Sequence, residues 1–144
     1  MRELTAAIDI GAPVERVWSV LTDFAAYAEW NPFIKEIDGD LTPGSKLEVK
    51  IEPPGGRGMT LKPKVVRSEE QRELVWLGHL LVPRLFDGEH QFRLTPLGPG
   101  RTRFTQHEEF RGILVPLTGA VLEKTLRGFE QMNAALKLRA EQVG

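Results

Sequence analysis

The N-terminal part of the chain changes from strand-like to helix-like patterning. Residues 4–10 alternate between apolar and more polar side chains, which predicts a strand with one buried face. Apolar residues then recur at helical spacing over 14–21, and a second short helix is predicted over 24–29. Asn31-Pro32 ends this helical part, because the residue before a proline disfavours the α-helical region.

The central part of the chain is a series of short strand patterns separated by turns. Glycine and proline residues interrupt apolar runs that are too short for helices. Six strands are predicted, over residues 34–37, 47–51, 59–65, 74–82, 86–94 and 102–110. The three residues 98–100 are predicted to form the turn of the last hairpin, and Asp87-Gly88 to form a turn or bulge.

The last element is a long amphipathic helix that begins at Pro116. Its apolar stripe consists of Leu117, Val121, Leu122, Thr125, Phe129, Met132 and Leu136. Gly119 and Gly128 within it indicate either close contact with the sheet or room for a ligand. One strand, two short helices, six strands and one helix favour an α+β fold with an antiparallel sheet. One helix covers a flat sheet poorly, so we predict that a seven-stranded sheet curves around it.

Length and composition exclude several classes of protein. The 144 residues fit a single domain over residues 1–144. The net charge is −1 and no two Lys or Arg residues are adjacent, so we expect no nucleic-acid partner. The absence of cysteine excludes disulfides, thiolate nucleophiles and Cys-ligated zinc. No cofactor and no metal are predicted, since the three histidines show no metal-site spacing.

The hydropathy of the chain also indicates where in the cell the protein is located. No apolar run approaches the ~20 residues of a membrane span. The N-terminal residues lack the apolar run of a signal peptide. We therefore expect a cytoplasmic protein that is not embedded in a membrane, and whether it is a monomer or a homodimer stays open.

Several segments resemble a known superfamily. The segments at 12–18 (APVERVW), 21–24 (LTDF) and 30–33 (WNPF) resemble the opening of START-like domains of the SRPBCC superfamily. The segments at 87–94 (DGEHQFRL), 102–104 (TRF) and 109–112 (EFRG) are similar to its polyketide cyclase/dehydrase and lipid-transport branch. The resemblance covers nearly the whole chain and implies a helix-grip fold with an internal cavity. It implies no single reaction, because the superfamily contains carriers, cyclases, hormone receptors and co-chaperones.

Side-chain alternation assigns the inner face of the strand predicted at 86–94. Asp87, Glu89, Gln91 and Arg93 form a polar face, which should point to solvent. His90 lies on the opposite face and is therefore expected to point inward.

The strand predicted at 102–110 is expected to pair with the strand predicted at 86–94. One of its faces is wholly polar, which leaves Gln106 and Glu108 on the inner face. Counting back from the predicted turn pairs His90 with Glu108, and such directly opposed residues have Cβ atoms ~4.5–5.5 Å apart. A slip of two residues would instead place His90 opposite Gln106 or Phe110.

The roles of these inward residues stay open. His90 and Glu108 orient a polar end of the ligand, act as acid and base, or form a mutually satisfied structural pair. Trp76 lines the cavity or covers the outer face of the sheet, and Trp30 with the two residues after it forms a structural corner or a lid. The predicted ligand-binding residues are Met59, Leu61, Trp76, Phe86, His90, Phe92, Gln106, Glu108, Phe110, Leu122 and Phe129.

Three functions are consistent with these residues and with the resemblance. The first is a binding or carrier protein for a small hydrophobic ligand of lipid, polyketide or aromatic type, since an apolar cavity with few polar groups is typical of such sites. The second is a polyketide cyclase/dehydratase-like enzyme that uses His90 and Glu108 as acid and base. The third is a co-chaperone-like interaction module, which requires an exposed apolar patch and would be favoured by a solid interior.

Overall fold

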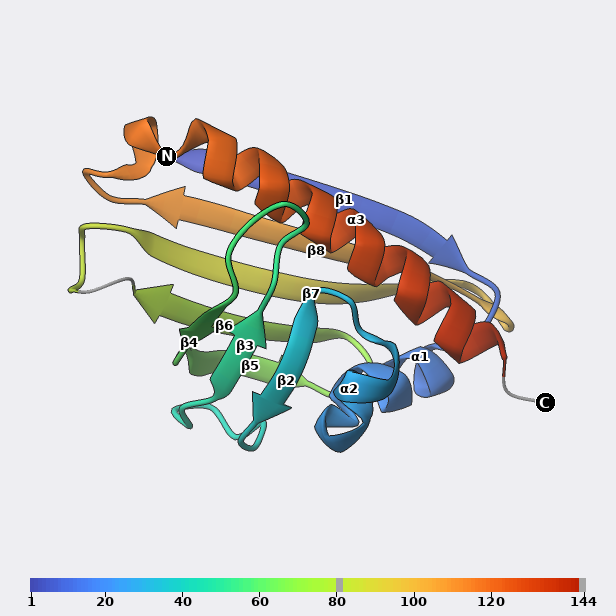
Figure 1. Cartoon of the computed structure of the whole chain (residues 1–144). Helices are drawn as coiled ribbons and strands as arrows, with labels where there is room; N and C mark the ends of the chain where they lie inside the picture. The colour runs from blue at the N-terminus through green and yellow to red at the C-terminus, as the bar shows by residue number, and fades with distance from the viewer. Residues whose placement is uncertain (80–81, 143–144) are drawn as a thin grey trace.

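The computed structural model describes residues 1–79 and 82–142. Its elements, in chain order, are β1 (Arg2–Ile10), α1 (Val14–Thr22), η1 (Phe24–Ala26), α2 (Tyr27–Trp30), β2 (Ile34–Asp38), β3 (Glu48–Ile51), β4 (Met59–Leu61), β5 (Lys64–Glu69), β6 (Glu73–His79), β7 (Asp87–Gly98), β8 (Arg101–Arg111), η2 (Val115–Leu117) and α3 (Gly119–Glu141). The long helix α3 lies diagonally across one face of the larger sheet (Figure 1). The short strands β2–β4 lie in front of that same face, so the core is enclosed between them, α3 and the larger sheet.

The strands form two antiparallel sheets that are joined along one edge. One sheet has the order β1-β8-β7-β6-β5 and the other the order β2-β3-β4. Backbone hydrogen bonds connect them, because the Gly44 N–H donates to the Val65 carbonyl and the Val65 N–H donates to the Ser45 carbonyl, each over 2.8 Å. The α+β class with an antiparallel sheet and a long C-terminal helix is confirmed.

The predicted count of seven strands is wrong, because the strand expected at 59–65 is divided. Pro63 lies between β4 and β5 and has no N–H to donate to a strand ladder. Its carbonyl instead accepts a 2.8 Å hydrogen bond from the Leu47 N–H. The chain therefore leaves the edge of the small sheet at β4 and enters the large sheet at β5.

Two further boundaries differ from the predictions. The helix expected over 24–29 is a short 3₁₀ turn followed by α2. The strand expected over 74–82 is described as β6, which ends at His79, while Leu80 and Leu81 lie outside the described residues and Val82 lies in a bend.

The start of the C-terminal helix also needs correction. Residues 115–117 form the 3₁₀ helix η2, and α3 begins only at Gly119. Leu117 is 81% exposed and Val121 is 53% exposed, so both were wrongly placed in a buried stripe. The remainder of that stripe, from Leu122 to Leu136, is buried as predicted.

The segment after α2 is a structural corner. The Asn31 side-chain carbonyl accepts hydrogen bonds from the backbone N–H groups of Phe33 (3.0 Å) and Ile34 (2.8 Å). The Tyr27 hydroxyl donates to the Leu21 carbonyl, which ties α2 to the end of α1. These bonds hold Asn31 buried at the corner and turn the chain into β2.

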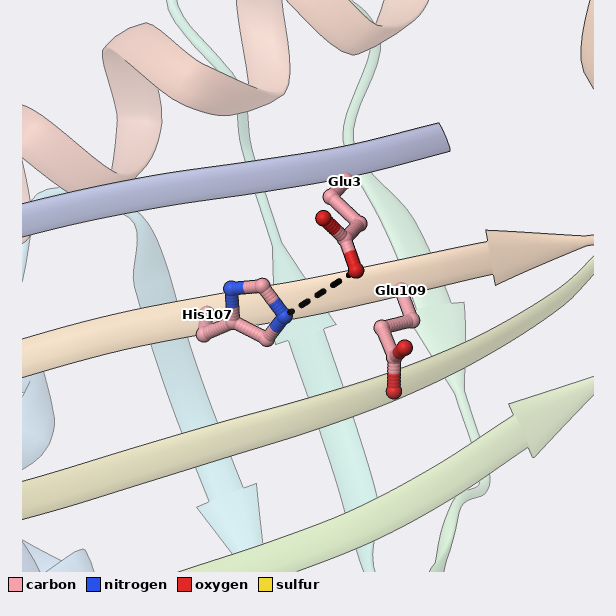
Figure 2. Close-up of side chains that lie close together, drawn as sticks. All are labelled: Glu3, His107 and Glu109. Carbon is pink, nitrogen blue, oxygen red and sulfur yellow. Dashed lines mark ion pairs between the residues drawn. The ribbon is translucent and has the colours of Figure 1, made fainter. Parts of the chain in front are cut away.

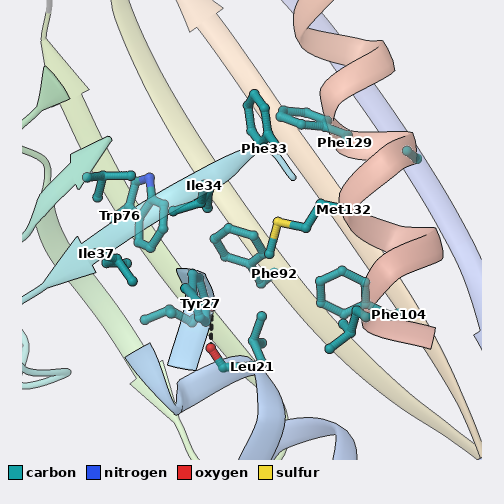
Figure 3. Packing of buried hydrophobic residues seen from close by; sticks show 14 of the residues in the cluster. Leu21, Tyr27, Phe33, Ile34, Ile37, Trp76, Phe92, Phe104, Phe129 and Met132 are labelled. Atoms are coloured by element: carbon teal, nitrogen blue, oxygen red, sulfur yellow. Dashed lines mark hydrogen bonds between the residues drawn. The ribbon is translucent and has the colours of Figure 1, made fainter. Parts of the chain in front are cut away.

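The centre of α3 approaches the rest of the core closely. The ring of Phe33 packs edge-on against Phe129, with ring centroids 5.7 Å apart (Figure 3). Gly128 faces Phe33 so closely that a Cβ at this position would clash with the Phe33 ring. Gly128 therefore serves close packing, whereas a Cβ at Gly119 would meet no atom within 4 Å. No helix among the described residues is long and apolar enough to cross a membrane.

Candidate functional site

A pocket of about 260 Å³ lies between the inner face of the large sheet, the small sheet and the N-terminal half of α3. Its walls are largely apolar, and the residues come from β2, β3, β4, β6, β7, β8, α3 and adjoining loops. Most of the residues predicted from the sequence line it, namely Met59, Leu61, Trp76, Phe86, His90, Glu108, Phe110 and Leu122. Trp76 thus lies on the pocket side of the sheet, packed edge-on against His90 with ring centroids 5.5 Å apart.

Three predicted lining residues lie deeper and are absent from the pocket wall. Phe92, Gln106 and Phe129 are buried beneath it in the core. The reason is the His90 ring, which stacks on Phe92 at a centroid distance of 4.2 Å and lies 4.8 Å from Phe129. His90 is therefore the boundary between the pocket and the solid core, and the pocket-lining prediction for these three residues was wrong.

The sequence interpretation missed part of the wall. The missed residues are Phe33, Ile34, Val49, Ile51, Lys62, Pro63, Gly78, His79, Gly88, Leu114, Thr118, Val121 and Thr125. Ile34, Val49 and Ile51 were recognised as apolar strand positions, but only the placement of the small sheet beneath α3 brings them to the pocket. Gly88 was interpreted as a turn or bulge, yet it belongs to the regular ladder of β7.

A larger hollow of about 730 Å³ lies elsewhere, along the β5–β6 turn and the distal part of β7. It is lined mostly by exposed residues, among them Glu69, Glu70, Arg72 and Arg93. Such a surface of solvated charges does not enclose an apolar molecule, so we take the smaller pocket as the candidate site.

The pairing of His90 with Glu108 is confirmed. The β7–β8 register places these residues directly opposite each other, and His90 Nδ1 lies 3.4 Å from Glu108 Oε1. The predicted turn was wrong, however, because Gly98 pairs with Arg101 and only two residues form the turn. A bulge at Leu97 takes up the extra residue and restores the predicted register further along the hairpin.

Gln106 determines which nitrogen of His90 carries the proton. The Gln106 amide nitrogen donates to the Phe129 carbonyl (3.2 Å) and to Asn133 Oδ1 (2.8 Å). A backbone carbonyl only accepts, so the Gln106 amide oxygen must face His90 Nε2, which lies 2.9 Å away. His90 Nε2 therefore donates to Gln106, and in the neutral ring Nδ1 presents a lone pair toward Glu108.

Burial keeps both His90 and Glu108 uncharged near neutral pH. Burial lowers the pKa of His90 to about 3, although the hydrogen bond to Gln106 opposes this shift. Burial also raises the pKa of Glu108 to about 8. The two side chains have the spacing of an ion pair, but desolvation outweighs the attraction, so the contact joins a carboxylic acid and a neutral imidazole. Because 3.4 Å is long for a hydrogen bond, the Glu108 hydroxyl remains available to the pocket.

Removing Gln106 tests this network. We expect Gln106→Leu to destabilise the fold by about 1–3 kcal/mol, because the His90 N–H then lacks its acceptor and the Phe129 carbonyl its side-chain donor. Gln91→Leu on the outer face is the matched control. Gln91 is itself buried, contrary to the expectation that it points to solvent, but its partner Arg93 is exposed and can bind water when the Gln91 amide is removed. Urea unfolding of both variants measures the difference, and equal losses of stability would contradict the network.

A second polar cluster lies on the outer face, away from the pocket. Glu3 on β1 and His107 and Glu109 on β8 offer donor atoms within 4.8 Å of one another (Figure 2). Strand pairing rather than spacing in the sequence brings them together, because Glu3 is opposite Glu109. Ordinary side-chain contacts also engage the cluster, with Thr5 Oγ1 2.7 Å from His107 Nδ1 and Arg111 3.8 Å from Glu109.

Comparisons with known proteins show the family and the fold of the chain. The model of the family described as polyketide cyclase / dehydrase and lipid transport matches residues 1–141. None of the curated proteins compared matches the chain.

Solved structures share the fold over nearly the whole chain. A START superfamily protein from Mycobacterium smegmatis is 22% identical with a TM-score of 0.74, over 99% of each chain. A protein from Mesorhizobium loti is 21% identical with a TM-score of 0.77, again over 99% of each chain. The Zhui aromatase/cyclase from Streptomyces sp. R1128 is 16% identical with a TM-score of 0.80, over 98% of this chain and 94% of that one. At these identities the likeness establishes the fold alone.

Proposed function

The chain belongs to the polyketide cyclase/dehydrase and lipid transport family, and we propose that it binds a small, uncharged, mostly apolar molecule in the pocket under α3. The observation that carries this proposal is the combination of largely apolar walls with a buried polar pair, His90 and Glu108, that burial keeps neutral. Lys62 and His79 also line the pocket but are exposed. A pocket of this kind is the usual form of a small-molecule site.

The volume of the pocket and the neutral state of His90 and Glu108 restrict the kinds of ligand that can bind. At about 260 Å³ the pocket lies just below the ~300–1,000 Å³ that drug-sized ligands occupy, which favours a compact ring system or short chain over a lipid with two acyl chains. A charged group placed beside Glu108 would have to be desolvated without an ionic partner, which is costly. A neutral oxygen, by contrast, can accept the Glu108 hydroxyl proton in a hydrogen bond.

Enzymatic dehydration or cyclisation is the second candidate, and the raised pKa of Glu108 favours it. A general acid works best when its pKa lies near the operating pH, and about 8 meets that condition. Two histidines among the described lining residues could serve as the partner base, namely His79 and His90. His79 is exposed and its Nδ1 lies 2.7 Å from Asp87 Oδ1, so it is not buried with Glu108. His90 presents its Nδ1 lone pair, but burial lowers its pKa to about 3, so it would accept a proton poorly. We therefore rank binding above catalysis, and the pocket also argues against the interaction module, which a solid interior would have favoured.

Blocking the pocket tests the proposed function. Val121 lines the pocket from α3 and is 53% exposed, so a tryptophan there can fill the pocket without entering the core. We expect wild-type protein to bind 2-naphthol in isothermal titration calorimetry at pH 6, and Val121→Trp to weaken binding about tenfold or more. Leu138→Trp is the matched control, since Leu138 is 64% exposed on the same helix and outside the pocket wall.

Three other outcomes of these measurements would contradict ligand binding in this pocket or favour the enzyme. Equal binding by Val121→Trp and wild type would place the site elsewhere and contradict the proposal. Tighter binding of the anion 2-naphthoate than of 2-naphthol would contradict a neutral site. Turnover of a β-hydroxy ketone that is lost in Glu108→Gln, while 2-naphthol binding persists, would favour the enzyme.

A further inference from the structure

Two glycines face each other on the sheet side of the pocket. Gly78 on β6 is the register partner of Gly88 on β7, and both line the pocket. Large side chains surround them on the same face of the sheet. Trp76 and His90 form the adjacent row, and Phe110 pairs with Gly88 from β8. The pocket floor is therefore a short strip of bare backbone between aromatic walls.

The lack of a side chain has a different consequence at each glycine. A Cβ at Gly88 would lie 2.5 Å from Glu108 Oε2 and 3.5 Å from Phe110 Cε1. Gly88 therefore leaves the space in which the Glu108 carboxyl group stands. A Cβ at Gly78 would meet only Pro63 Cβ, at 3.7 Å, so the space above Gly78 belongs to the pocket.

Backbone conformation does not account for either glycine. Neither is among the glycines with positive φ, and both lie in the regular ladder between β6 and β7. Any residue can adopt such extended backbone, so local geometry does not require glycine here. A glycine inside a strand usually weakens it and marks a place where another group approaches the backbone closely.

We propose that Gly78 forms the seat of the ligand, that Gly88 makes room for the Glu108 carboxyl group beside it, and that together they restrict the pocket to flat ring systems whose uncharged oxygen faces Glu108. This inference rests on the proposed function and adds the ligand's shape to it. A flat ring lies face-on against the bare backbone at Gly78, whereas a puckered ring touches it at only a few atoms and loses dispersion contacts. Leu122 and Thr125 on α3 line the opposite side of the pocket and complete a slot.

Two probes with the same carbon skeleton test the inference. 2-Naphthol is flat, and trans-2-decalol carries a hydroxyl at the same position on a puckered, saturated skeleton. The decalol oxygen is the better hydrogen-bond acceptor, so a preference for 2-naphthol cannot come from the hydrogen bond that Glu108 donates. We expect wild-type protein to bind 2-naphthol about tenfold or more tightly than decalol in calorimetry. We expect Gly78→Ala to weaken 2-naphthol binding and to reduce this preference by about fivefold or more, because a methyl group then stands on the seat.

Gly88→Ala adds a test of the positioning of Glu108. The added methyl displaces the carboxyl group, so both affinity and the pH at which binding is lost should change. Gly98→Ala is the matched control, since it makes the same change on the same strand and its Cβ meets no atom within 4 Å. Should Gly88→Ala fail to fold in thermal unfolding, Gly78→Ala still decides the question, because it clashes with no atom.

The outcomes distinguish the seat from the proposed function. Equal affinities of wild-type protein for both probes, or an unchanged preference in Gly78→Ala, would overturn the glycine seat while leaving ligand binding intact. Binding of neither probe by wild-type protein would contradict the proposed function and the seat together.

Discussion

Gly128→Ala is expected to destabilise the protein by about 1–3 kcal/mol, although alanine is the better helix former. The added methyl would clash with the ring of Phe33, which is buried and packs edge-on against Phe129. Phe129 is enclosed in the core, whereas Phe33 also lines the pocket, so the Phe33 ring could yield only by moving into the pocket and losing its edge-on contact with Phe129 (Figure 3). Overpacking of this kind commonly costs more than the ~1 kcal/mol that replacing glycine in a helix regains.

Gly119→Ala, in the same helix, is expected to change the free energy of unfolding in the opposite direction and stabilise the protein. A Cβ at Gly119 meets no atom within 4 Å, so only the gain in helix propensity remains, up to about 1 kcal/mol of added stability. Urea unfolding of the two variants should therefore differ by about 2–4 kcal/mol. Two stabilised variants would show that α3 does not approach Phe33 as closely as described.

Glu108→Gln is expected to reverse the pH dependence of stability above pH 5. In the folded protein Glu108 holds its proton up to a pKa of about 8, whereas an unfolded glutamic acid releases it near its ordinary value of 4.5. Between these values the folded state binds more protons than the unfolded state, so stability falls as the pH rises. Because glutamine cannot ionise, the Glu108→Gln variant does not show this decrease in stability with rising pH.

His90 has the opposite effect on the pH dependence of stability. Its pKa is lowered from 6.5 to about 3, so the unfolded state binds the extra proton as the pH falls through that window, and stability declines toward acid. The two effects together make the contribution of this pair to the free energy of unfolding largest between about pH 4.5 and 6.5. Wild-type protein should lose stability from pH 5.5 to 8, while Glu108→Gln should not.

Urea unfolding at pH 5 and pH 8 measures this effect. We expect the stability difference between wild type and Glu108→Gln to change by about 3–4 kcal/mol over this interval, in favour of the variant at the higher pH. Glu109→Gln, next in sequence but on the outer face of the sheet, is the matched control and should keep the wild-type profile. Parallel pH profiles for wild type and Glu108→Gln would show that Glu108 is ionised in the folded protein near neutrality.

The polar pair in the site was predictable because strands impose a strict alternation. The inward direction of His90 and Glu108 follows from the polar positions beside them, and the register from the length of the hairpin. The predicted turn contained one residue too many, and only the bulge at Leu97 kept the register correct. Nothing in the local sequence distinguishes a bulge at Leu97 from a longer turn.

The depth of each inward residue was not predictable. Phe92 and Trp76 both lie on the inner face, yet only Trp76 reaches the pocket. The difference depends on where α3 touches the sheets, and that contact depends on Gly128 and Phe33, which are 95 positions apart in the chain. The glycine strip was missed for a similar reason, because Gly78 and Gly88 become neighbours only through the β6–β7 pairing.

The indole N–H signals of the three tryptophans test the central claim most directly. Trp76 lines the pocket, whereas Trp18 and Trp30 are absent from its wall. In ¹H–¹⁵N correlation spectra recorded during a 2-naphthol titration, we expect the Trp76 indole signal to shift progressively and the other two to stay in place. A stationary Trp76 signal at saturating 2-naphthol, or a shift confined to Trp18 or Trp30, would contradict ligand binding in this pocket.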